Sequence, residues 1–345
     1  MSERVEAMID WDLAVSLGSR IAGEGPEVTR DQAAATVAEL RADADRSTGL
    51  VREFTGLVAQ ERTAPVLVVD RAGWVQANAD GFKTVLAPVV DQLTGKKAPG
   101  PLATAVGSKV TGAEVGGLLG FLAGKVLGQF DPFHDPHGRL LLVAPNIVHV
   151  ERELGADPTD FRLWVCLHEE THRVQFTAVP WMRDHLFAQI EALAATMQPD
   201  ALLDDGLKRA LESLRQGVGG GSLLDVVGSP EQKEIIDRVT AVMSLLEGHA
   251  DVVMDGVGPT VIPSVAKIRA SFDERRKGVG TLDRLLRRLL GLDAKMAQYR
   301  DGARFVRGVV DKVGMVEFNA VWERPENLPT RDEVADPDRW VSRVL

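Results

Sequence analysis

The chain has 345 residues, 45% of them hydrophobic, so it can bury a large core and form one large domain or two. Its 50 acidic residues outnumber 40 basic ones, which gives a formal net charge of −10 at pH 7. This balance argues against binding nucleic acid or an anionic membrane through a basic surface. The single cysteine, Cys166, excludes an internal disulfide and a cysteine-rich metal site, so a metal would need histidine and carboxylate ligands.

The N-terminal segment, residues 1–15, lacks a basic region followed by an uninterrupted apolar run, so it does not resemble a secretory signal. We therefore expect a cytoplasmic protein. Short apolar runs at residues 65–70 and 140–144 predict two strands. Helical patterns dominate the rest and cover residues 30–60, 158–176, 181–197, 201–216, 230–255, 281–300 and 302–312. The sequence thus predicts a mainly α protein of the α+β class with a small β-sheet.

The most apolar stretch, residues 106–130, contains Lys109, Glu114 and Lys125, which argues against a membrane span. Glycines recur in it every four residues: Gly112, Gly116, Gly120, Gly124 and Gly128. On a helix this spacing forms a flat ridge that lets a second helix approach closely. The pattern predicts a tightly packed core helix, and a contact between subunits of a homo-oligomer is the alternative.

A metal-binding pattern lies in the helix predicted from residue 158. Asp157 is a good N-cap and Pro158 suits the first turn. Helical spacing then puts His168 and His172 on one face, where both imidazoles can bind one zinc ion. Glu169, about 100° around the helix, can reach a metal-bound water and act as general base. The alternative is a surface helix with two incidental histidines.

A catalytic zinc ion usually takes three protein ligands, so a third must be found. Gln175 and Ala178 stand where a metzincin would have glycine and a third histidine, which excludes that class. After His172, Glu247 is the only glutamate with an aspartate four residues on, Asp251. This pair resembles the second helix of thermolysin-like gluzincins. We expect Glu247 to be the third ligand and Asp251 to orient a metal-bound histidine.

Two further residues are candidates for catalysis. His249 follows Glu247 by two residues, so it projects to another side of the helix, where it could stabilise an oxyanion or face another helix. Tyr299, the only tyrosine, lies in a helical pattern, and its phenol could polarise a scissile carbonyl. The alternative for Tyr299 is a core residue with a satisfied hydroxyl.

Four stretches carry a family resemblance: LLLVAPNIVHVERELGADPTDFRLWVCLHEETHRVQF, PWMRDHL, EGHADVVMD and FNAVWERPENLPTRDEVADPDRWV. They resemble the zincin-like metallopeptidase type 2 family, an actinobacterial group described as associated with deazaflavin-coenzyme biosynthesis. The resemblance implies a helical zincin-type fold with a small sheet. It also implies His168 and His172 as ligands, Glu169 as base and Glu247 as the third ligand. It does not imply a substrate, or that this chain makes or binds the coenzyme.

We expect a single zincin-like domain with a helical N-terminal part (1–60), a metal-binding body (61–318) and an extended C-terminal tail (319–345). The predicted function is a zinc-dependent metallopeptidase that cleaves a peptide or amide bond with a metal-activated water. Its partner would be a peptide or protein substrate. The alternative is a catalytically silent, zinc-stabilised scaffold, which a fourth protein ligand such as His249 would favour. A weaker alternative is a binding module that acts near deazaflavin enzymes.

Overall fold

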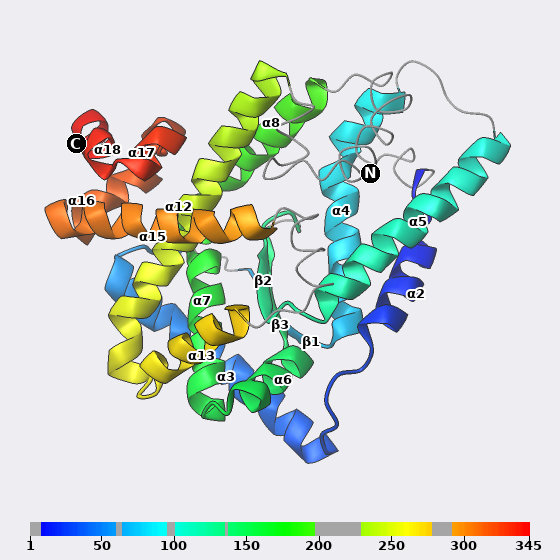
Figure 1. Cartoon of the computed structure of the whole chain (residues 1–345), viewed down its shortest axis with the longest axis horizontal. Coiled ribbons are helices and arrows are strands. Elements are labelled where there is room, and N and C mark those ends of the chain that lie inside the picture. Colours follow the sequence, from blue (N-terminus) through cyan, green and yellow to red (C-terminus); the bar gives the residue numbers. More distant parts are fainter. Residues whose placement is uncertain (1–7, 60–63, 95–100, 135–136, 197–228, 278–291) are drawn as a thin grey trace.

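A computed structural model describes residues 8–59, 64–94, 101–134, 137–196, 229–277 and 292–345 (Figure 1). Helices make up most of this part, and one small sheet accompanies them, as the sequence predicts. The first half contains α2 (Trp11–Ala22), α3 (Arg30–Thr55), β1 (Val66–Val69), α4 (Arg71–Thr94), α5 (Pro101–Ala123), β2 (Gly128–Asp131), β3 (Arg139–Val143) and α6 (Ala144–Leu154). The second half contains α7 (Pro158–Ala178), α8 (Trp181–Ala195), α12 (Pro230–Val261), α13 (Val265–Lys277), α15 (Leu292–Val313), α16 (Met315–Phe318), η2 (Asn319–Trp322), η3 (Pro325–Asn327), α17 (Arg331–Ala335) and α18 (Pro337–Val344).

The sheet has the strand order β1-β3-β2, and its central strand β3 is parallel to β1 and antiparallel to β2. All five residues of β3 are buried, because helices cover both faces of the sheet. Leu141 and Val143 pack against α2, α4 and α5, while Leu142 packs against α3 and α7. The sequence predicts β1 and β3 but not β2, which is short and begins with a glycine that looked like part of the preceding helix.

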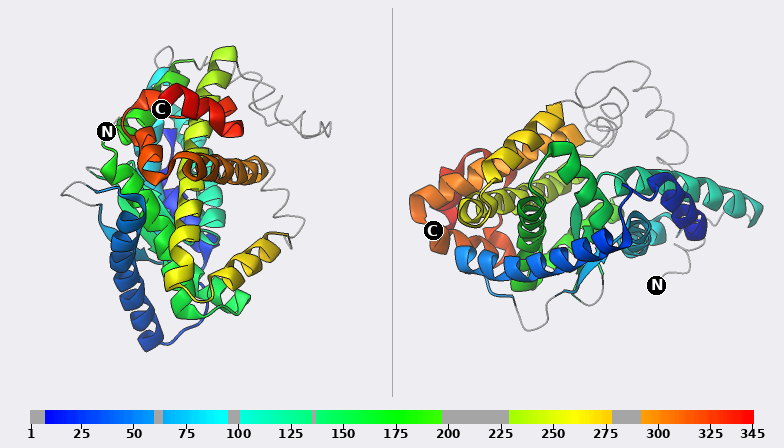
Figure 2. Two further views of the ribbon diagram at one scale, coloured as in Figure 1. Left: turned by 90° about the vertical axis from the view of Figure 1, so that its left-hand side faces the viewer. Right: turned by 90° about the horizontal axis from the view of Figure 1, so that it is seen from below.

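Helix α7 lies in the middle of the molecule (Figures 1 and 2). It packs against α3, α12 and β2. Helices α2 and α5 lie at one end of the molecule, and α15 with the C-terminal helices lies at the other (Figure 2). The helix that carries the histidine pair is therefore held between the sheet and a second long helix.

The glycine ridge of α5 packs against α2. A Cβ atom at Gly112, Gly116 or Gly120 would lie 2.5, 2.7 or 2.7 Å from a backbone oxygen of the α2 region. These contacts support the prediction of a core helix over the oligomer contact. The helix ends at Ala123, so Gly128 belongs to β2 instead. None of the described helices is long and apolar enough to cross a membrane.

The C-terminal residues 319–345 form short helices, whereas the sequence predicts an extended tail. Pro325 and Pro337 of this segment occupy first-turn positions, where proline favours the start of a helix. Trp322 and Trp340 are buried against α12 and α15. The predicted helix 201–216 lies outside the described residues, as does much of the predicted helix 281–300.

Candidate metal centre

Two long helices supply the residues of the site. Helix α7 starts as predicted, because the Asp157 carboxylate accepts a hydrogen bond of 3.0 Å from the backbone N–H of Asp160. Helix α12 begins with a capping box in which Ser229 and Gln232 satisfy each other's backbone N–H groups. The pairing of these helices brings Glu247 of α12 over the histidine face of α7.

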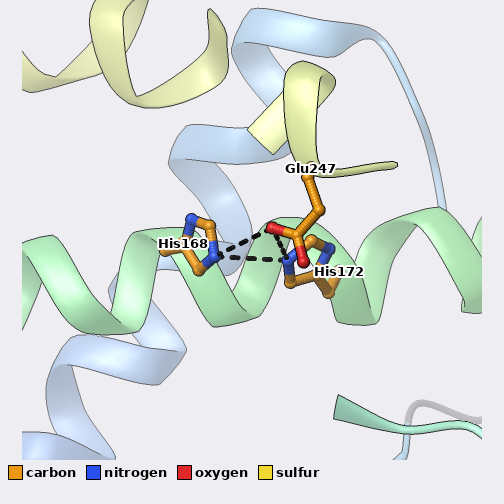
Figure 3. A group of neighbouring side chains, drawn as sticks. All are labelled: His168, His172 and Glu247. Carbon is orange, nitrogen blue, oxygen red and sulfur yellow. Dashed lines mark hydrogen bonds and ion pairs between the residues drawn. The ribbon is translucent and has the colours of Figure 1, made fainter. Parts of the chain in front are cut away.

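His168, His172 and Glu247 point toward one another (Figure 3). The two imidazole Nε2 atoms are 3.3 Å apart. The Oε2 atom of Glu247 lies 3.5 Å from Nε2 of His172 and 3.7 Å from Nε2 of His168. The side chains of His172 and Glu247 are only 13% and 12% exposed, so water screens their charges weakly.

These distances fit a zinc ion. Zinc binds imidazole nitrogen and carboxylate oxygen at about 2.0–2.1 Å in a tetrahedral arrangement, which separates neighbouring donors by about 3.3 Å. The observed separations of 3.3, 3.5 and 3.7 Å are within a few tenths of an ångström of that value. Three atoms that offer lone pairs at such distances would repel one another without a shared cation or proton. The donor set is thus complementary to a small cation.

The raised pKa of His172 also indicates that the site favours positive charge. Burial acts to lower this pKa, but the neighbouring Glu247 carboxylate outweighs it, and the pKa rises to about 9. The carboxylate of Glu169 adds to the rise, so it lies within Coulombic reach of the site. The raised pKa means that the surroundings of His172 favour positive charge, as a bound cation would supply.

The residues behind the two histidines were not predicted from the sequence. Nδ1 of His172 lies 3.0 Å from Oε1 of Gln175, and Nδ1 of His168 lies 3.1 Å from the sulfur of Met254. The spacing did contain a signal: Gln175 is three residues after His172, and Met254 is seven after Glu247, so each shares a helix face with a predicted ligand. Both groups behind the histidines are uncharged.

Asp251 lies elsewhere than the sequence predicts. Its carboxylate accepts hydrogen bonds of 3.0 Å from Arg269 and 2.6 Å from Arg307, which belong to α13 and α15. Asp251, four residues after Glu247, is offset from it by about 40° around the helix, and in this direction it meets the two arginines. Asp251 therefore links α12 to α13 and α15. The position behind His168 is occupied by Met254 instead.

His249 is fully buried, and its ring stacks on Phe318 at 5.7 Å and meets Trp322 at 5.3 Å between centroids. Of its two predicted alternatives, this placement matches the one in which it faces another helix. Burial and the nearby His172 lower the pKa of His249 to about 3, so its imidazole is neutral. Tyr299 belongs to α15, but its side chain lies outside the described residues, and its role stays a prediction.

Glu169 is 8% exposed and lies between α7 and strand β2. A Cβ atom at Gly128 would be 2.5 Å from Cγ of Glu169 and 2.7 Å from its Cδ. A side chain at this position would displace the carboxylate of Glu169 from its place. An isolated glycine in a strand is typical of such a close approach, but the strand itself was not predicted.

A helix with two histidines four residues apart, facing a glutamate from a second helix, is typical of zincin-type metal-dependent hydrolases. The sequence pattern of the zincin-like metallopeptidase family matches residues 9–341, and the chain belongs to that family. A crystal structure from Chloroflexus aurantiacus, of a protein described as a candidate hydrolase with a novel fold, is 33% identical and has a TM-score of 0.73. That similarity covers 97% of this chain and 98% of the other. No curated protein matches this chain.

Proposed function

We propose that the chain is a zinc-dependent metallopeptidase that hydrolyses a peptide or other amide bond. The convergence of His168, His172 and Glu247 carries this proposal. Within the described residues, this group is the one set of three histidine, cysteine or carboxylate side chains arranged to hold a metal. Three protein ligands are the usual number in a catalytic zinc site, where the fourth position is left to water or substrate.

A zinc ion bound there would polarise the scissile carbonyl and lower the pKa of a bound water. Glu169 then acts as general base: its carboxylate takes a proton from the attacking water and passes that proton to the leaving nitrogen. Its placement between α7 and Gly128 supports this role, because the carboxylate is shielded from solvent yet close enough to raise the pKa of His172.

Strand β2 supports a peptide as the substrate. It is the last strand in the sheet order, so its outer edge pairs with no other strand in the described part of the chain. At Gly128 the strand also lies next to the side chain of Glu169, the proposed general base. An extended peptide can add to such an edge through main-chain hydrogen bonds, which would bring its backbone alongside Glu169.

The silent scaffold remains the alternative, and the position of His249 weighs against it. A structural zinc site usually has four protein ligands. The Nδ1 atom of His249, the nearest candidate by sequence, lies 2.9 Å from the amide of Gln175 and does not join the donor set. A buried general base beside the donor set would also have no purpose in a scaffold.

The resemblance to deazaflavin-associated proteins suggests a separate test, a titration with that coenzyme.

The decisive measurement is the metal content of the wild-type protein and of Glu247→Ala after dialysis, by elemental analysis. We expect about one zinc ion per wild-type chain and its loss in the variant, since two histidines alone bind zinc weakly. Glu169→Gln should keep the zinc and lose hydrolysis of a peptide library by about 10²- to 10⁴-fold. A metal-free wild type, or a fully active Glu169→Gln protein, would refute the proposal.

A further inference from the structure

We infer that Gln175 and His249 are positioning residues that hold His172 with its Nε2 atom toward the metal. This inference rests on the proposed function, because it assigns a role to residues behind the proposed ligand set. It starts from a chain of contacts that leads from the site into the core: His172 to Gln175, and Gln175 to His249.

The orientation of the Gln175 amide follows from its backbone partner. Nε2 of Gln175 lies 2.9 Å from the carbonyl oxygen of Leu246, and a carbonyl can only accept a hydrogen bond. The amide nitrogen must therefore be on that side, and the amide oxygen must face His172. Because Oε1 can only accept, the Nδ1 atom of His172, 3.0 Å away, must carry the proton. In the neutral ring this leaves the lone pair on Nε2, the atom that faces Glu247 and His168.

His249 fixes the second hydrogen of the same amide. Nδ1 of His249 lies 2.9 Å from Nε2 of Gln175, so this ring nitrogen accepts and the proton of His249 is on its other nitrogen. Phe318 stacks on the ring, and Trp322 meets it in a T-shaped contact. These aromatic contacts keep the ring from turning, and a ring that cannot turn keeps its acceptor aimed at Gln175.

Both anchors of Gln175 belong to α12, the helix that also supplies Glu247. Leu246 is the residue before Glu247, and His249 is two residues after it. One short segment therefore provides the third ligand and, through Gln175, the orientation of a ligand on α7. Groups behind metal-bound histidines typically contribute about 10- to 100-fold to metal affinity. In this protein the amide of Gln175 is the group behind His172, and the buried ring of His249 keeps that amide in place.

The test measures zinc affinity in a double-mutant cycle, by competition with a chromophoric chelator. The proteins are the wild type, Gln175→Met, His249→Phe and the double variant. Methionine keeps the volume of Gln175 without the polar atoms of its amide, and phenylalanine keeps an aromatic ring in contact with Phe318 and Trp322. We expect Gln175→Met to weaken zinc binding about 10- to 100-fold and His249→Phe to weaken it less. The double variant should match Gln175→Met alone, because His249 acts through Gln175.

A control and a conservative replacement separate this role from general damage to the core. Thr171→Val changes a buried hydroxyl on α7 that donates a hydrogen bond to the carbonyl oxygen of Leu167 in the same helix, and it should leave zinc affinity unchanged. His249→Asn places an amide oxygen where Nδ1 accepts, and should bind zinc more tightly than His249→Phe. Urea unfolding of the metal-free proteins shows whether each variant is folded.

Wild-type affinity in Gln175→Met would overturn the inference, as would losses that simply add in the double variant. Either result leaves the proposed function intact, provided that the wild type binds zinc and hydrolyses peptides. A wild type that binds no zinc would instead refute the proposed function itself.

Discussion

Glu169 and Glu170 are chemically identical neighbours, and the fold gives them different surroundings. Glu169 lies beside the donor set and against Gly128. Glu170, about 100° further around the helix, is fully buried and accepts hydrogen bonds from Arg173 and from Thr48 of α3. Although burial raises the pKa of Glu170, Arg173 and Thr48 favour its charged form. The different contacts of the two carboxylates therefore suit Glu169 to a role in catalysis and Glu170 to a structural role.

Gly128→Ala should reduce catalysis without removing the metal. The added methyl group would overlap the side chain of Glu169, and the carboxylate would have to move from its place. We expect hydrolysis to fall by at least about tenfold, since a positioned base contributes about 10²- to 10⁴-fold. Zinc content should stay at the wild-type level. Gly117→Ala, where a Cβ atom meets no atom within 4 Å, is the matched control. Unchanged hydrolysis in Gly128→Ala would contradict the placement of the base.

The raised pKa of Asp43 leads us to expect that the stability of the protein depends on pH. It is 7% exposed, and burial together with the nearby Glu39 raises its pKa from 3.8 to about 6. A raised carboxyl pKa means that the folded protein binds the proton more tightly than the unfolded chain. Stability from this group is therefore complete below pH 3.8 and is lost as the pH rises through about 6.

Replacing Asp43 with Asn removes this ionisation. The difference in unfolding free energy between Asp43→Asn and the wild type should change with pH. It should favour the variant by about 2 kcal/mol more at pH 7.5 than at pH 4.5. Urea unfolding of both proteins at the two pH values measures the difference. If the stability difference between the two proteins does not change with pH, the carboxyl of Asp43 does not titrate in this range.

At the scale of elements, glycine contacts decide how closely helices approach. The ridge of α5 meets the backbone of α2, and Gly248 of α12 meets Gly302 of α15. Each glycine costs up to about 1 kcal/mol of helix propensity relative to alanine, so these helices depend on their packing. The second contact lies directly after Glu247. The position of a proposed ligand is thus fixed by a backbone contact between two long helices.

Gly116→Ala and Gly117→Ala should change stability in opposite directions. A Cβ at Gly116 would lie 2.7 Å from the carbonyl oxygen of Ala14, so we expect a loss of about 1–3 kcal/mol from overpacking. Gly117 faces open space, and alanine there should add up to about 1 kcal/mol through helix propensity. Urea unfolding measures both. Stabilisation by both substitutions would mean that α2 and α5 do not pack as described.

At the scale of the whole molecule, the C-terminal residues belong to the core. Trp340 is fully buried among Phe305, Phe318 and neighbouring residues of α12 and α15. Its indole N–H donates a hydrogen bond of 2.7 Å to the carbonyl of Asn327. The C-terminal helices thus support α12, the helix that carries Glu247, and residues 319–345 pack on the body as short helices, not as an extended tail.

Trp340→Ala should cost about 3–5 kcal/mol of unfolding free energy, as large-to-small changes of buried aromatic residues do. Thermal unfolding should show a clearly lower midpoint. Val316→Ala, at a side chain that is 80% exposed, is the control and should change stability by less than about 0.5 kcal/mol. A Trp340→Ala protein as stable as this control would show that the C-terminal helices are not part of the core.

The sequence by itself determined the features that depend on local spacing. Two histidines four residues apart, after a good N-cap, lie on one helix face wherever that helix packs. The helical majority and the strands β1 and β3 follow from periodicity in the same way. The resemblance and the spacing from Asp251 also selected Glu247, which the structure brings within 3.7 Å of both histidines.

Only the tertiary structure decided which groups stand behind and beside these ligands. Gln175 meets His249 across 74 residues, Met254 meets His168 across 86, and Gly128 meets Glu169 through a strand that the sequence did not predict. Asp251 has the expected spacing but faces two arginines from other helices. Spacing fixes which side chains share a face of one helix. What packs against that face depends on contacts between distant segments, which local patterns do not specify.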